Sequence, residues 1–400
     1  MSISGIRQAS CVLLALLTIA LTGACAHSDQ GGSASASPPG ATPWAKPTST
    51  MAWNDYAWEL IARNQIGQFP SARTFAYMNL AINNALVTAR EKGLKPDGAA
   101  AGAAATVLTF MFPKEEQAIA KRLAGETAAI GADGRQAFTA GVEIGQTAAA
   151  TVITWAKEDR SGADWSGSVP VGPDRWASQA QPPKPPIGPQ LGGSRPFFMT
   201  TGSEFRAPAP PAFDSASFKA GVAEVRKVSD TRTNEQLRVA QYWENLTGAY
   251  SAGLWNEVAR GTISAHGLDE ATSARILAMM HMAAMDAFIA CHDSKYTYWA
   301  PRPTQVDPGI RLAIAIPNHP SYPSNHACIS GTIGLVLDGF FPDQGGRYFA
   351  MGRQAGESRV YAGIHYRFDL DAGFDIARKL SAKALQTGIP ADRPFAPLGR

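Results

Sequence analysis

The chain of 400 residues is poor in charge, and this shortage excludes some classes of function. Charged residues make up 17% of the sequence and the net charge is +3, with the positive residues scattered along the chain. Nucleic-acid-binding proteins gather lysine and arginine on one face, so we expect no nucleic-acid partner. A pattern of several long apolar runs is also missing, which argues against a site embedded in a membrane.

Cysteine is scarce too, and the four cysteines form two groups. Cys11 and Cys25 lie in an N-terminal segment that has the pattern of an export signal: Arg7, a short apolar run and closing small residues. The end of this segment also resembles a lipobox whose leucine is displaced by one position, so a lipid anchor at Cys25 and simple secretion both stay open. We expect an exported protein, whether periplasmic, held at the cell surface or secreted. This address permits a disulfide between Cys291 and Cys328, and two buried free thiols are the alternative.

Alternation with a period of two residues is absent over any useful length, which argues against a β fold. Apolar residues instead recur at helical spacing, for example over Ala72–Arg90, where Pro70 and Ser71 supply a start signal. Prolines cluster further along the chain and predict a long extended loop, anchored by its aromatic residues. We therefore predict an all-α helical bundle with a long Pro-rich surface loop.

The expected organisation has five parts: a signal at 1–25, a flexible tether at 26–50, an N-terminal helical region at 51–160, the Pro-rich loop at 161–212 and a C-terminal helical catalytic region at 213–400. In the last part, helices are expected at Asn234–Arg260, Asp269–His292, Asn325–Phe340, Arg347–Ala355 and Asp369–Thr387. We favour one continuous helical body with the loop wrapped over it. The sequence does not indicate an oligomeric state.

Three separated segments of the C-terminal region carry residues suited to one kind of chemistry. They read K-x6-RP from Lys295, PSNH from Pro323, and SR-x5-H-x3-D from Ser358. A tetrahedral oxyanion spreads its charge over several oxygens, and a lysine with two arginines, Arg302 and Arg359, suits those oxygens. The Pro-Ser pair of the second segment starts a helix, whose first amide groups can point at the anion.

A histidine and a carboxylate complete the third segment. His365 and Asp369 are four residues apart, so on a helix they share a face and the carboxylate can accept from one ring nitrogen. The other nitrogen is then free as a lone pair. Each of these residues alone has an ordinary structural explanation, such as an ion pair. Coincidence does not explain six such positions together. No H-E-x-x-H pair is present and we expect no divalent metal site, while His281 and His292 are expected in the core or at its rim.

The three segments resemble the motifs of the type 2 phosphatidic acid phosphatase (PAP2) and vanadium haloperoxidase superfamily, with Asn325 in place of the usual glycine. The resemblance implies a helical bundle of the PAP2/haloperoxidase type. It implies that His365 forms a phosphohistidine or ligates vanadate, that His326 acts as the acid, and that Asp369 orients His365. The implied phosphate- or vanadate-binding residues are Lys295, Arg302, Ser324, Asn325 and Arg359.

The resemblance implies two activities for the same pocket. We favour a phosphatase that hydrolyses phosphomonoesters and needs no cofactor. The alternative is a haloperoxidase that holds vanadate and oxidises halide with peroxide, and a non-catalytic phosphate-binding protein is a second alternative. His319 lies five residues before Ser324, where bromoperoxidases of the family carry a histidine near vanadate, although a structural cap explains it equally well.

Overall fold

Every regular element in the described part of the chain is helical, which confirms the predicted fold class. The structure, a computed structural model, describes residues 48–245 and 250–399. The predicted signal at 1–25 and most of the predicted tether lie outside these residues. The first described helix already begins at Ser49, within the range expected for the tether. The N-terminal helices are α2 (Ser49–Arg63), α3 (Gln68–Glu91), α4 (Pro96–Met111), α5 (Glu116–Ala129) and α6 (Ala132–Lys157).

The N-terminal helices pack closely because many of their contact residues have almost no side chain. A Cβ atom added at Gly102 of α4 would collide with the backbone of Val142 on α6. One added at Gly145 of α6 would collide with the backbone of Ala99 on α4. The many alanines and glycines of this region therefore serve to bring helix backbones together.

The Pro-rich segment between α6 and the next helix is a long loop with one short 3-10 turn at Leu191–Gly193. Its residues Trp176, Phe197 and Phe198 are buried, which confirms their predicted role as anchors. A carboxylate on a core helix reinforces the anchor, because Asp286 accepts hydrogen bonds from the backbone nitrogens of Phe197 and Phe198, each at 2.7 Å. The loop is thus held by both apolar burial and backbone hydrogen bonds.

The C-terminal region forms a second set of helices. They are α7 (Ala216–Thr231), α8 (Asn234–Asn245), α9 (Tyr250–Ala265), α10 (Glu270–Tyr298), α11 (Pro303–Val306), α12 (Asn325–Phe340), α13 (Arg347–Tyr361) and α14 (Arg367–Thr387). The single helix expected at Asn234–Arg260 is described as α8 and α9, and residues 246–249 between them lie outside the described part of the chain. The helix expected over Ala72–Arg90 begins earlier, at Gln68, and α3 includes Pro70 in its first turn.

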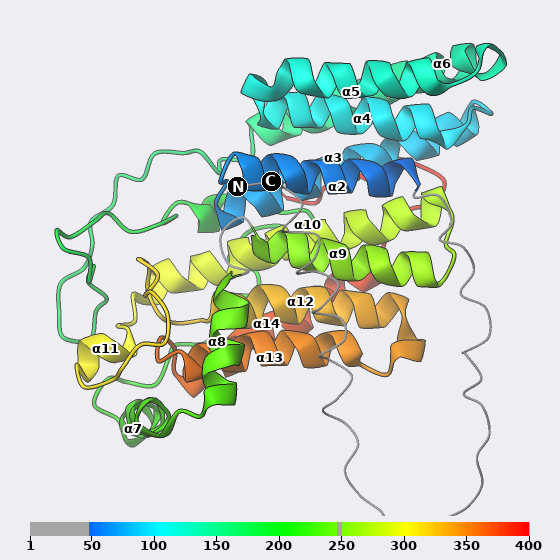
Figure 1. Cartoon of the computed structure of the whole chain (residues 1–400). Helices are drawn as coiled ribbons and strands as arrows, with labels where there is room; N and C mark the ends of the chain where they lie inside the picture. Colours follow the sequence, from blue (N-terminus) through cyan, green and yellow to red (C-terminus); the bar gives the residue numbers. More distant parts are fainter. Residues whose placement is uncertain (1–47, 246–249, 400) are drawn as a thin grey trace, which may run out of the picture. The chain divides into compact units, whose positions relative to one another are not determined.

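Helix α10 lies between the two sets of helices, with α3 packed on one side and α12 on the other (Figure 1). Phe75 of α3 stacks on His281 of α10 with ring centroids 4.6 Å apart, so that histidine is a core residue as predicted. The segment Glu270–Val306 is apolar and long enough to cross a membrane, but 94% of its most apolar window is buried inside the structure. Helix α10 is therefore the core helix of one body to which both regions contribute.

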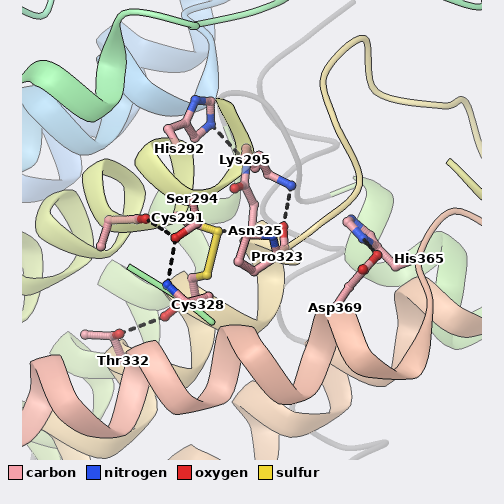
Figure 2. Close-up of a disulfide and its surroundings, with 12 residues drawn as sticks. Cys291, His292, Ser294, Lys295, Pro323, Asn325, Cys328, Thr332, His365 and Asp369 are labelled. Atoms are coloured by element: carbon pink, nitrogen blue, oxygen red, sulfur yellow. Dashed lines mark hydrogen bonds and ion pairs between the residues drawn. A yellow bond between two sulfur atoms is a disulfide. The ribbon is translucent and has the colours of Figure 1, made fainter. Parts of the chain in front are cut away.

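A disulfide joins Cys291 of α10 to Cys328 of α12 (Figure 2). The sequence left a disulfide and two free thiols open, and the structure has the disulfide. The bond lies close to two of the motifs, because Lys295 follows on α10 and Ser324 is the N-cap of α12. It therefore fixes the first motif next to the second.

Candidate active site

The histidine of the third motif lies just before α14 rather than on it. Tyr366 is the N-cap of α14, and Asp369 occupies the third position of its first turn. The Oδ2 atom of Asp369 accepts hydrogen bonds from the backbone nitrogen of Tyr366 at 3.1 Å and from Nδ1 of His365 at 2.8 Å. The prediction that both residues share a helix face was wrong. Their contact instead forms because the carboxylate caps the helix and reaches back to the preceding residue.

Arg302 determines which nitrogen of His365 carries the hydrogen. Its Nη1 atom lies 3.0 Å from Nε2 of His365, and a guanidinium can only donate. The ring is therefore neutral, with hydrogen on Nδ1 and a lone pair on Nε2. Burial and the positive charges of Arg302 and Lys295 hold the pKa of His365 well below its usual value of 6.5, in agreement with this form.

Lys295 is buried at the end of α10 and directs its ammonium group to a bend of the chain. Its Nζ atom donates to the carbonyl oxygens of Pro320 at 2.9 Å and Ser321 at 2.8 Å. It also donates to the carbonyl oxygen of Pro323 (Figure 2). Burial is the main cause that lowers the pKa of Lys295, and the charge of Arg302 adds to it. The lysine thus holds the 320–323 segment in place and brings a positive charge near His365.

The start of α12 presents polar atoms whose hydrogen-bonding capacity is not used within the described residues. The buried atoms Oγ of Ser324, Oδ1 of Asn325 and Nε2 of His326 have no hydrogen-bond partner there. A buried polar atom left without a partner costs free energy, so these atoms are suited to receive a ligand. On the other side of Asn325, its Nδ2 atom lies 3.3 Å from Nε2 of His292.

The backbone amide of Ser324 is bound in a different way. Its nitrogen donates to the carbonyl oxygen of Asp369 at 3.0 Å, which ties the second motif to the third. A glycine permits this approach, because a Cβ atom at Gly373 of α14 would lie 2.7 Å from Cβ of Ala327 and 3.0 Å from the oxygen of Ser324. The motif residues meet because a residue without a side chain faces the start of α12.

Within the described residues, Arg359 makes no hydrogen bond to His365. Its Nη1 atom lies 3.2 Å from Oε2 of Glu244, and its Nη2 atom donates to the carbonyl oxygen of Ala240 at 2.9 Å, both on α8. Arg359 nevertheless remains within electrostatic reach, since its charge lowers the pKa of both Arg302 and His326. The structure therefore brings Lys295, Arg302, His365 and Asp369 together and turns Arg359 toward α8.

His319 contacts the same arginine as His365. Its Nδ1 atom lies 3.1 Å from Nη2 of Arg302, and its carbonyl oxygen accepts from Nε of Arg302 at 3.0 Å. The rings of His319 and His292 have centroids 5.9 Å apart. The backbone contact is of the structural type that the sequence left open, and the ring contact places His319 beside the arginine that also contacts His365.

Ser321 is a site residue that the sequence analysis missed. Its Oγ atom donates to Oδ2 of Asp369 at 2.6 Å and lies 3.4 Å from Nδ1 of His365. It thus helps to orient the carboxylate that holds the histidine. The available signal was its position between Pro320 and Pro323, next to the second motif.

A cavity of about 30 Å³ adjoins the start of α12, where His326 and Asn325 form part of its wall. This volume holds about one water molecule. Its lining residues come from α3, α9, α10 and α12, and none of them is a lysine, arginine, aspartate or glutamate: Gln68, Ala72, Ala252, Trp255, His281, Ala284, Phe288, Asn325, His326, Ile329, Ser330 and Ile333. The N-terminal region thus helps to enclose the space beside the site.

Residues 275–386, which include all three motifs, match the sequence profile of the PAP2 superfamily. This match, together with the three motifs, supports the PAP2/haloperoxidase superfamily for the segment that it covers. The PAP2 fold is also found in similar solved structures. One is described as the first bacterial vanadium-dependent iodoperoxidase, with 21% identity, a TM-score of 0.74, and coverage of 85% of this chain and 96% of that chain. Another is a holo-type bacterial vanadium-dependent chloroperoxidase, with 16% identity, a TM-score of 0.63, and coverage of 84% and 92%.

The apo-type structure of a bacterial vanadium-dependent chloroperoxidase is similar as well, with 16% identity, a TM-score of 0.63, and coverage of 86% of this chain and 96% of that chain. No curated protein sequence matches the chain. At these identities the similarity shows the fold, which the PAP2 superfamily shares between phosphatases and vanadium haloperoxidases.

Proposed function

We propose that this PAP2-superfamily chain is a vanadate-dependent haloperoxidase, which converts halide, hydrogen peroxide and a proton to hypohalous acid and water. The closure of the candidate site carries this choice over a phosphatase. Arg302 and Lys295 have 0% exposure and His365 has 2%. A buried site suits small reactants such as peroxide and halide, whereas a phosphomonoester also has to place its organic group.

The likeness over 84–85% of the chain to structures described as iodoperoxidase and chloroperoxidase supports the same choice. That coverage extends beyond the PAP2 profile at 275–386 into the N-terminal helices. Those helices enclose the cavity at His326, so they have a place in a haloperoxidase site.

The residues present fit vanadate. The Nε2 atom of His365 carries a lone pair and is a suitable ligand atom. The cations Arg302 and Lys295 suit the charge of the oxyanion. The unpartnered Oγ of Ser324 can donate to an oxygen. Vanadate, when bound, would supply Lewis-acid activation of peroxide.

The chain's own residues would then orient reactants and move protons. Asp369 and Ser321 hold the ring of His365 so that its lone pair keeps one direction. His326 is neutral because burial and the charge of Arg359 lower its pKa well below 6.5. Its unpartnered Nε2 can accept a proton from incoming peroxide and return it to departing water.

A phosphatase is the second candidate, favoured by the neutral His365, whose Nε2 lone pair lies beside Arg302 and near the charge of Lys295. His365 would attack the phosphorus atom, His326 would protonate the leaving oxygen, and water would release phosphate from the phosphohistidine.

A paired assay of the purified protein tests both candidates. We expect bromide- or iodide-dependent halogenation of monochlorodimedone that requires added vanadate and peroxide. Hydrolysis of p-nitrophenyl phosphate that is blocked by vanadate, without halogenation, would establish the phosphatase instead. A folded sample with neither activity that still binds phosphate would leave a non-catalytic binding protein.

We also propose that the protein is exported. The signal pattern around Arg7 supports this, and so does the disulfide between Cys291 and Cys328, since disulfides persist in oxidising compartments. Cell fractionation of the wild type and of Cys25→Ser tests the address. Release of the variant from the membrane fraction would indicate a lipid anchor at Cys25, equal release of both would indicate secretion, and retention of both in the cytoplasm would contradict export.

A further inference from the structure

The last turns of α8 surround the guanidinium of Arg359. Besides the contacts to Glu244 and Ala240, its Nε atom donates to Oγ of Ser358 at 2.9 Å. Arg359 is 1% exposed, whereas the side chain of Glu244 is 31% exposed. The pair therefore joins a buried cation to a carboxylate that partly faces solvent.

The same turn of α8 also contacts His326, the residue proposed to transfer protons in the site. The carbonyl oxygen of Trp243 raises the pKa of His326, against the lowering by burial and by Arg359. The indole nitrogen of Trp243 donates to Gln354 of α13 at 3.2 Å, which fixes α8 to the helix that carries Arg359. Helix α8 thus forms a wall beside two residues of the candidate site.

The carboxylates near the site have different partners. Asp369 accepts from His365, while Glu244 accepts from Arg359. A guanidinium has five N–H donors, so Arg359 can keep its bonds to α8 and still donate to an oxyanion. A carboxylate in contact with it fixes its orientation, and it also offsets the positive charge that would attract the anion.

We infer that Glu244 is a positioning residue that holds Arg359 in place and lowers the affinity of the site for its oxyanion. This inference rests on the proposed function, because it requires that the site bind phosphate or vanadate. The bound anion and Glu244 compete for the charge of one arginine. Glu244 thereby sets how much free oxyanion is needed to fill the site.

The substitution Glu244→Gln separates the charge from the hydrogen bond, since glutamine keeps an acceptor oxygen. Isothermal titration calorimetry with inorganic phosphate, and separately with orthovanadate, measures the Kd at neutral pH and low salt. We expect binding to become about two- to fivefold tighter, the range for a partly exposed ion pair. A misfolded variant would bind more weakly, so the expected direction cannot arise from damage. The gain should shrink in high salt.

Two further variants complete the test. Glu235→Gln is the matched control, because Glu235 lies on α8 but pairs with Arg238 and is 68% exposed; its Kd should change by less than about twofold. In an Arg359→Ala background, Glu244→Gln should change the Kd no further. If the wild type binds the anions and Glu244→Gln does not lower the Kd, the inference is overturned and the proposed function is not. The same holds if Glu244→Gln lowers the Kd equally in the Arg359→Ala background. A wild type that binds neither anion would overturn the proposed function with it.

Discussion

At the scale of single residues, the lone pair on Nε2 of His365 is the atom on which either proposed chemistry depends. We expect His365→Ala to reduce turnover by a factor on the order of 10⁴ or more, as losing a nucleophile or metal ligand does. Steady-state kinetics measures the change in turnover, in whichever of the two assays, halogenation or phosphate-ester hydrolysis, the wild type is active. Circular dichroism should show an intact fold, and turnover near the wild-type rate would remove His365 from its role.

Ser321 offers a test of how His365 is oriented. Ser321→Ala removes the donor at 2.6 Å from Asp369, which leaves the carboxylate less firmly directed at the ring. We expect kcat to fall about tenfold, as for other residues that support a ligand, with little change in oxyanion affinity. Ser381→Ala on α14 is the control, because its hydroxyl bonds only a backbone oxygen in the described structure, that of Arg378. A kcat that is unchanged in Ser321→Ala would show that Asp369 needs no such support.

The motif residues could be predicted from sequence because their spacing is local, but their partners could not. The partner of Arg359 is Glu244, which lies 115 residues earlier in the chain, and no local pattern marks it. Ser321 was missed because a serine in a loop has many ordinary uses. The helix expected at Asp369–Thr387 starts earlier, at Arg367, and Asp369 lies in its first turn, where its carboxylate binds the backbone of the N-cap residue Tyr366.

At the scale of elements, one buried carboxylate connects the Pro-rich loop to α10 and makes the anchor sensitive to pH. Burial raises the pKa of Asp286 to about 7 from 3.8, although the amides of Phe197 and Phe198 act to lower it. The folded state then binds the proton more tightly than the unfolded state. The stability from this group is full below about pH 4 and is lost as the pH rises through about 7.

We therefore expect the free energy of unfolding to fall by up to about 4 kcal/mol between these pH values through this group alone. In Asp286→Asn the free energy of unfolding should not fall with pH through this group. The variant should be less stable than the wild type at low pH, because the amide replaces one hydrogen-bond acceptor by a donor. Urea unfolding of both proteins over the pH range gives the difference in slope. Parallel curves would show that Asp286 keeps one protonation state throughout.

The disulfide between α10 and α12 supports a second prediction at this scale. It closes a loop with a sequence separation of 37 residues, so its loss in Cys291→Ser/Cys328→Ser should lower stability by about 2–4 kcal/mol. The bond also holds Lys295 near the start of α12, so oxyanion binding should weaken with it. Thermal unfolding with and without reductant measures the first effect, and reductant should not change the double variant. Equal stability of wild type and variant would contradict the expected contribution.

The ends of a helix could be predicted from the sequence where residues next to them set the boundary. Helix α12 begins and ends as the sequence predicted, because Pro323 and Ser324 precede it and Phe341 is followed by Pro342. The range expected as one helix includes α8 and α9, and the residues between them lie outside the described part of the chain.

At the scale of the whole molecule, the two helical regions share a core across α10. Phe69 of α3 meets Phe288 of α10 edge to face with centroids 5.7 Å apart, and Thr50 of α2 donates its backbone amide to Glu270 at 2.7 Å. The same α10 carries Lys295. The PAP2 profile at 275–386 therefore marks the motifs but not the full unit that folds.

We expect a fragment of residues 213–400 to fail to fold on its own, because the apolar face of α10 that contacts α3 would be exposed. A bare helix face of this kind favours aggregation. The full chain should unfold in a single cooperative transition, since contacts of one core are lost together. Calorimetry of the full chain, with circular dichroism and phosphate titration of the fragment, measures both. A soluble fragment that binds phosphate with the affinity of the full chain would show that the N-terminal helices form an independent unit.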